Sequence, residues 1–206
     1  MSDLSLFLVT EDPLGEALIR AMIQQSGILF NIEGKGSVGG KGAIRSRMVS
    51  YNQLARQYPV LVLTDLDDAL CPGSLLEEWL PEPAARGLLF RLAVREAEAW
   101  VMAHREALAS FLAIPETKIP QRPDELPDAK GSFLQLIRKS KNNRLKKEML
   151  PDPEQATPIG LHYNEHLKNF VFGHWRVKTA LENSPSLSRT WKRLLEIPHL
   201  FSEKRV

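Results

Sequence analysis

The sequence has a single cysteine, no hydrophobic run long enough to cross a membrane and almost no net charge. Cys71 alone cannot form an intrachain disulfide or a cysteine-based zinc site. A transmembrane helix needs about 18 consecutive apolar residues, and no stretch of the sequence is that long, so we expect no membrane span. The N-terminal stretch has no basic region and only a short apolar run, so we expect no signal peptide and a cytoplasmic protein. The net charge of +2 indicates that any nucleic-acid-binding surface is local.

Short apolar runs alternate with helical patterns over the first half of the 206-residue chain. This alternation predicts an α/β fold with a mainly parallel sheet flanked by helices. The first helix has the clearest boundaries, with Asp12 as N-cap, Pro13 at the first helical position and Gly27 as the stop. The predicted strands are 4–10, 28–34, 60–64 and 87–94, and the predicted helices are 12–27, 43–57, 73–80 and 95–112.

The character of the chain changes near Ala113. Prolines are frequent over 115–127, which predicts an irregular connector, and three helical stretches follow at about 132–149, 162–182 and 186–195. We therefore expect an α/β core over residues 1–112. Residues 113–206 are expected to form a Pro-rich connector and a helical C-terminal extension that packs against the core.

Acidic residues follow three of the four predicted strands. Glu11 follows the first strand, Asp65 and Asp67 the third, and Glu96 and Glu98 the fourth. In a parallel sheet these positions share the carboxyl edge, and residues i and i+2 leaving a strand point in roughly the same direction. Crowded carboxylates repel unless a cation neutralises them, and oxygen-only ligands suit Mg²⁺ or Mn²⁺. The pattern predicts one or two such ions and phosphoryl or phosphodiester chemistry.

Helix capping is the simpler explanation for any one of these acids. An aspartate at a strand–helix junction accepts hydrogen bonds from free N–H groups and interacts favourably with the helix dipole. Asp68, just before the predicted helix at 73–80, is the strongest candidate for such a cap. Acids at three separate strand ends are harder to explain by capping alone.

The ordered set of a glutamate after the first strand and Asp-x-Asp after a later strand resembles the Toprim fold. Glu11, Asp65 and Asp67 occupy the positions of that signature, and the resemblance covers about residues 4–105. The Toprim fold occurs in type IA and II topoisomerases, bacterial primases and OLD-type nucleases. The chain departs from the usual Glu-Gly pair because Asp12 follows Glu11, and Glu16 takes the place of the further acid.

The segment "VREAEAWVMAHREAL" extends the resemblance to a group of bacterial Toprim-like proteins, related to OLD-type nucleases. In that group an E-x-E-x-W motif follows the next strand, here Glu96, Glu98 and Trp100, and "PDAKGSF", "HYNEHLKNFV" and "SPSLSRTWKRL" also match. Such proteins are often encoded beside AAA-type ATPases in defence or mobile islands. The resemblance implies an ATPase partner and a role in phage defence or in DNA or RNA processing.

The resemblance implies metal-assisted phosphodiester hydrolysis, and therefore a nuclease. Glu11, Asp65 and Asp67 would be catalytic, Glu96 and Glu98 would complete the metal ligands, and Glu11 could ligate a metal or act as general base. A topoisomerase is disfavoured because no tyrosine has a recognisable partner domain and the chain is too short for a gate.

Two basic segments are candidates for binding a nucleic-acid backbone. The glycine-rich "GKGSVGGKG" at 34–42 fails the Walker pattern, but its loop could present backbone N–H groups to phosphates, together with Lys35, Lys41, Arg45 and Arg47. The second segment, "RKSKNNRLKK", contains no acid. Its basic residues are Arg138, Lys139, Lys141, Arg144, Lys146 and Lys147. The simpler interpretations are a flexible surface loop and a solvated helix face.

Three further interpretations concern the acids and histidines. "HYNEH" at 162–166 matches a zinc-binding pattern, but the surrounding apolar stripe indicates packing in the core. A haloacid-dehalogenase-type phosphatase would use Asp65 as nucleophile and Asp67 as acid, although that motif usually follows the first strand. A Toprim-derived regulatory or binding subunit without catalysis is the third possibility.

Overall fold

The structure is a computed structural model that describes residues 4–67, 71–80, 83–152, 154 and 157–202. Its centre is a four-stranded parallel sheet in the order β2-β1-β3-β4, which confirms the expected α/β class. The strands are β1 (Leu4–Thr10), β2 (Phe30–Ser37), β3 (Val60–Asp65) and β4 (Leu88–Ala93). All six residues of β3 are buried, as expected for an inner strand covered on both faces.

Helix α1 (Pro13–Ser26) begins and ends where the sequence predicts. Asp12 is its N-cap, with Oδ1 accepting a hydrogen bond from the Gly15 N–H at 2.7 Å. Gly27 ends the helix in the left-handed conformation, with φ 72°, which a residue without Cβ adopts at little cost. These local signals lie within a few residues of each helix end, so the sequence defined both boundaries.

The two faces of the sheet are covered by different helices. The α1 side chains pack with Leu6 and Leu8 of β1 and Leu61 of β3 in one core cluster. On the other face, α2 (Lys41–Arg45), α3 (Met48–Leu54) and α4 (Pro72–Trp79) pack against alternate residues such as Val60 and Val62. The chain therefore crosses to opposite faces after β1 and after β3, which are neighbours in the sheet. Ligands of open α/β sheets bind at this kind of reversal, outside the carboxyl ends of the two strands.

Three local predictions differ from the structure. Strand β2 continues to Ser37, so it includes the first part of the glycine-rich segment. The predicted helix at 43–57 is divided into α2 and α3. Helix α4 has Cys71 as its N-cap, with Sγ accepting from the Ser74 N–H at 3.4 Å, whereas Asp68 lies outside the described residues.

The predicted helix at 95–112 is broken at His104 into α5 (Ala97–Ala103) and α6 (Arg105–Leu112). At the break, His104 Nδ1 accepts a hydrogen bond from the backbone N–H of Arg176, 72 residues away. Two 3₁₀ turns and five helices follow. They are η1 (Glu116–Lys118), η2 (Pro123–Glu125), α7 (Ala129–Lys139), α8 (Asn143–Met149), α9 (Tyr163–Gly173), α10 (Val177–Ala180) and α11 (Pro185–Ser202).

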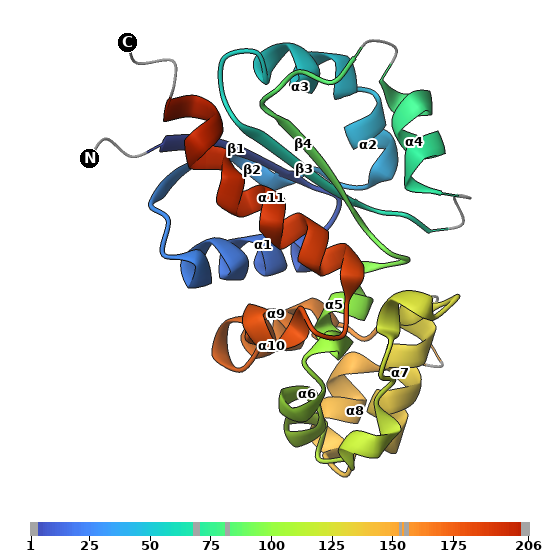
Figure 1. Ribbon diagram of the computed structural model, residues 1–206. Helices are drawn as coiled ribbons and strands as arrows, with labels where there is room; N and C mark the ends of the chain where they lie inside the picture. The colour runs from blue at the N-terminus through green and yellow to red at the C-terminus, as the bar shows by residue number, and fades with distance from the viewer. Residues whose placement is uncertain (1–3, 68–70, 81–82, 153, 155–156, 203–206) are drawn as a thin grey trace.

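The helical C-terminal segment shares its core with the sheet. Figure 1 shows α5 to α10 gathered on one side of the α/β layer, while α11 runs back across the sheet. Helix α11 packs against β4 and also contacts α1, and α9 packs against α1. The four tryptophans are all buried, Trp100 and Trp175 completely, so they contribute to packing of the core. Residues distant in sequence are thereby brought to the carboxyl edge of the sheet.

Candidate active site at the carboxyl edge of the sheet

Glu11 and Asp65 lie side by side where β1 and β3 end. The Glu11 carboxylate oxygen Oε2 accepts hydrogen bonds from Thr64 Oγ1 at 2.5 Å and from the Asp65 backbone N–H at 3.2 Å. The second oxygen, Oε1, receives no hydrogen bond from the described residues. Two adjacent strands thus position the Glu11 side chain and leave one oxygen available to a ligand.

Asp65 is a buried carboxylate of this edge with a raised pKa. Its side chain is buried, and Oδ1 accepts a hydrogen bond from the Ala97 N–H at the first residue of α5, at 2.9 Å. Burial raises the pKa of Asp65 well above its usual value, and negative charges on Glu98, Asp12, Glu11 and Asp67 raise it further. Burial is the larger cause of this shift, and the four neighbouring carboxylates add to it.

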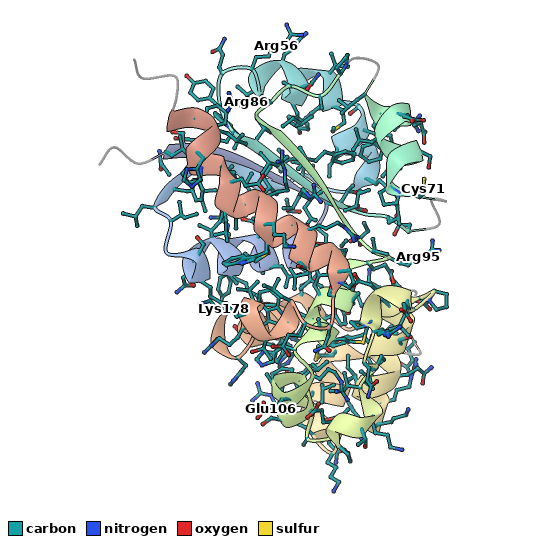
Figure 2. All side chains as sticks on the ribbon, in the orientation of Figure 1. Arg56, Cys71, Arg86, Arg95, Glu106 and Lys178 are labelled. Atoms are coloured by element: carbon teal, nitrogen blue, oxygen red, sulfur yellow. The ribbon has the colours of Figure 1, made fainter. Side chains whose placement is uncertain are left out.

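Asp67 has different partners from Asp65. Its backbone is in the left-handed region with φ 50°, and its N–H donates to the Arg95 carbonyl at 2.9 Å. Its Oδ2 accepts from Lys41 Nζ at 2.9 Å, and Lys41 belongs to the glycine-rich segment. Asp65 and Asp67 have different hydrogen-bond partners because β3 ends at Asp65 and the turn interrupts the strand alternation, and their convergence on one ion stays a prediction. Figure 2 labels Arg95, whose guanidinium donates to the Asp67 carbonyl at 2.8 Å, beside this turn.

Glu96 and Glu98 both contact the C-terminal segment. Glu96 Oε2 accepts from the Lys130 backbone N–H at 2.7 Å, and so binds the first turn of α7. Glu98 is 1% exposed, and its Oε1 accepts from Tyr163 Oη at 2.9 Å and lies 3.6 Å from Lys130 Nζ. Its second oxygen, Oε2, is buried with no partner among the described residues. Burial raises the pKa of Glu98 to about 7, although Lys130 and Tyr163 act in the opposite direction.

Sequence reasoning missed three residues of this cluster. Asp12 caps α1, but its charge also raises the pKa of Asp65 and Glu98. Burial lowers the pKa of Lys130, yet Glu98, Glu96, Asp65 and Asp12 raise it by more, so Lys130 stays positively charged. The pKa of Tyr163 is raised well above its usual value by burial and by Glu98. Asp12 was identifiable as a cap, but no sequence signal places Lys130 or Tyr163 at the sheet.

The donor atoms of the cluster fit a hard divalent cation in their chemistry. Glu11 Oε1, Asp65 Oδ2 and Glu98 Oε2 are carboxylate oxygens without a hydrogen-bond donor in the described part of the chain. However, over the described ranges no three His, Cys, Asp or Glu side chains are arranged to hold one ion. The ligand set of five acids expected from the sequence therefore stays a prediction. Glu16, the further acid of the motif, instead pairs with Arg20 at 2.7 Å.

The predicted basic residues occupy two separate places. Lys41 pairs with Asp67 at the site, and Arg45 pairs with Glu78 at 2.7 Å, while the side chain of Lys35 lies outside the described residues. The run at 138–147 is a helix end, a turn and a second helix, with Ser140 Oγ bonded to the Leu112 carbonyl at 2.6 Å. Its side chains are mostly exposed, and Arg144 pairs with Glu148. The run begins at Arg138, eight residues beyond Lys130, and so about 12 Å along α7 from the acidic cluster.

The two histidines of "HYNEH" bind separate carboxylates. His162 lies 3.0 Å from Glu165, and His166 lies 2.6 Å from Glu148. Neighbouring Tyr163 and Leu167 are buried in the core. The pattern at 162–166 is therefore explained by hydrogen bonding and packing.

Comparison of the chain with models of protein families, with curated proteins and with solved structures finds no match. Within the described residues, no helix is long and apolar enough to cross a membrane.

Proposed function

We propose that the chain is a metal-dependent nuclease of the Toprim type, acting on phosphodiester bonds with an AAA-type ATPase as partner. The observation that supports this best is the pairing of Glu11 and Asp65 at the β1–β3 reversal. Glu98, Asp12 and Asp67 lie close enough to Asp65 for their negative charges, together with that of Glu11, to raise its pKa. The ATPase partner, and the role in defence or in DNA or RNA processing, rest on the sequence resemblance alone.

Glu11 and Asp65 would hold the Mg²⁺ or Mn²⁺, because each has an oxygen that receives no hydrogen bond from described residues. A bound ion supplies a water of lowered pKa and neutralises charge that develops on the phosphate. Thr64 Oγ1 and the Asp65 N–H fix the orientation of Glu11. Lys130 adds a fixed positive charge beside Glu98, at 3.6 Å.

Two isosteric variants test the proposal. Asp65→Asn keeps an acceptor for the Ala97 N–H but removes the charge, and Glu11→Gln keeps an acceptor for Thr64 Oγ1. Each variant should lower Mn²⁺- or Mg²⁺-dependent cleavage of a nucleic-acid substrate by about 100-fold or more. Each should also weaken metal binding measured by calorimetry in the absence of substrate.

The matched control is Glu106→Gln, a charge removal on exposed Glu106 of α6, labelled in Figure 2. Thermal melting would confirm that all three variants remain folded. Full activity in Asp65→Asn or Glu11→Gln, with unchanged metal affinity, would contradict the assignment of the site.

A non-catalytic binding subunit is the second candidate, and one observation favours it. Each of the five predicted ligands accepts a hydrogen bond from the protein itself, from residues in five different segments. Such bonds also suit carboxylates whose role is structural. Tight association with an ATPase, together with no measurable Mg²⁺ affinity in the wild type, would support this candidate over the nuclease.

The phosphatase alternative is less well supported. It requires Asp65 to attack phosphorus as an ionised nucleophile, whereas burial raises its pKa and Oδ1 is bonded to the Ala97 N–H. Asp67, the acid in that scheme, pairs with Lys41 instead. Trapping a phosphate analogue on Asp65 would reverse this ranking.

A further inference from the structure

A group of positively charged side chains lies at the edge strand β4 of the sheet, close to the acidic cluster. Arg91 is on β4, the edge strand, and its side chain faces the same side of the sheet as Leu89 and Ala93, the side on which α11 packs. Exposed Arg189 and Lys192 and half-buried Arg193 are on α11. We call these four residues the β4–α11 basic patch.

The patch has more positive than negative charge. Arg189, Lys192 and Arg193 are spaced i, i+3 and i+4, so they share one face of α11. The only carboxylate of the described chain paired with them is Glu196, which lies 2.5 Å from Arg193. Burial lowers the pKa of Arg91, and the charges of Arg193 and Arg189 lower it further, so the three guanidinium groups are close neighbours. Arg91 Nε is buried without a hydrogen-bond acceptor among the described residues.

The patch is adjacent to the proposed catalytic edge. In the β3–β4 register, Asp65 pairs with Ala93 and Leu63 pairs with Arg91. With ordinary strand spacing, the Cα atoms of Arg91 and Asp65 are therefore about 8 Å apart. The start of α11 is fixed nearby, because Trp100 Nε1 of α5 donates to Ser186 Oγ at 2.6 Å.

From this arrangement we propose that the β4–α11 basic patch binds the phosphate backbone of the nucleic acid beside the acidic edge. The inference deepens the proposed nuclease function and rests on it. It assigns backbone binding to a surface different from the basic run at 138–147, which begins about 12 Å along α7 from Lys130. Cations next to an acidic edge would hold the strand where the carboxylates alone would repel it.

The test is binding of a labelled DNA duplex, and of an RNA of the same sequence, measured by fluorescence anisotropy in EDTA at several salt concentrations. The double variant Arg189→Gln/Arg193→Gln should weaken binding about tenfold at low salt and reduce the slope of log K against log salt by roughly 2. Glu196→Gln removes the opposing charge and should strengthen binding severalfold.

Two controls match the loss of charge. Lys168→Gln/Lys178→Gln removes two exposed cations from α9 and α10, where Figure 2 labels Lys178, and should leave binding unchanged. Arg138→Gln/Lys139→Gln removes two cations from the basic run. If this last variant weakens binding while Arg189→Gln/Arg193→Gln does not, the assignment to the β4–α11 basic patch is overturned.

The two proposals fail in distinguishable ways. If the wild type shows metal-dependent cleavage but Arg189→Gln/Arg193→Gln binds and cleaves normally, the role of the patch in binding is wrong and the proposed nuclease function is retained. If binding depends on the patch but no metal-dependent cleavage occurs, the role of the patch is retained and the proposed nuclease function is wrong. A wild type that neither binds nor cleaves nucleic acid overturns both.

Discussion

The carboxylates on the two sides of the Asp-Leu-Asp segment, residues 65–67, differ in their exposure to water and in their partners. On the side of the glycine-rich segment, Asp67 is 43% exposed in its side chain and pairs with Lys41 across a loop. On the helical side, Glu98 is 1% exposed and is contacted by α7 and α9. An exposed carboxylate can rely on water and one flexible cation, whereas a buried one loses its hydration and must find donors in the protein.

This contrast shows that the unfavourable electrostatic energy of the candidate site is concentrated on its buried carboxylates. Burial raises the pKa of both Asp65 and Glu98, the charge of Glu98 raises that of Asp65 further, and the charge of Asp12 raises both. A divalent cation would favour the ionised forms of both groups. We therefore expect the helical side to dominate the pH dependence of stability.

The largest effect is expected for Glu98→Gln. The pKa of Glu98 rises from 4.5 to about 7 on folding, so the folded chain binds more protons between these values and stability falls as pH rises. A glutamine does not titrate, and it should make the protein more stable than wild type by about 3 kcal/mol at about pH 8. The difference should be nearly absent at about pH 4. Denaturant unfolding at a series of pH values measures it.

The control for this prediction is Glu182→Gln, because Glu182 is exposed after α10. Its stability difference from wild type should be small and should not change across the same pH range. A pH-independent difference for Glu98→Gln would show that the pKa of Glu98 does not change on folding.

A smaller effect is expected for Tyr163→Phe. This change removes the hydroxyl that donates to Glu98 Oε1 at 2.9 Å, while Oε2 already has no donor in the described chain. We expect a loss of about 1–2 kcal/mol in unfolding free energy near neutral pH. The pKa of Glu98 should also rise, because the Tyr163 hydrogen bond lowers it.

Carboxyl ¹³C NMR across the pH range would follow the Glu98 pKa directly in Tyr163→Phe. Tyr58→Phe, an exposed tyrosine at the other end of the sheet, is the matched control. An unchanged Glu98 titration would separate Tyr163 from the acidic cluster.

The smallest effect is expected on the side of the glycine-rich segment. Lys41→Met and Asp67→Asn each remove one partner of an ion pair whose aspartate side chain is 43% exposed. Asparagine tolerates the left-handed conformation at position 67, so the turn should remain. A double-mutant cycle should give a coupling free energy below about 1 kcal/mol that decreases with salt. A coupling as large as the effect of Glu98→Gln would remove the difference between the two sides.

The parts of the fold that could be predicted from the sequence are those set by local signals, namely the ends of α1 and the strands of the sheet. Asp12, Pro13 and Gly27 define α1 through hydrogen bonds and backbone angles within a few residues of each end. The apolar runs identified all four strands of the sheet, and their parallel arrangement places Glu11 and Asp65 at one edge. These features depend on short stretches of chain, so a single sequence is enough to predict them.

The tertiary structure alone decided which carboxylates are buried, paired or without a partner. Glu96 and Glu98 look alike in the sequence, yet Glu96 binds the backbone of α7 while Glu98 is covered by Tyr163 and Lys130. The Arg91 side chain meets α11 in the same way, across about 100 residues of chain, because α11 folds back over β4. Burial and charge depend on which distant segment covers a residue, and no local pattern encodes that choice.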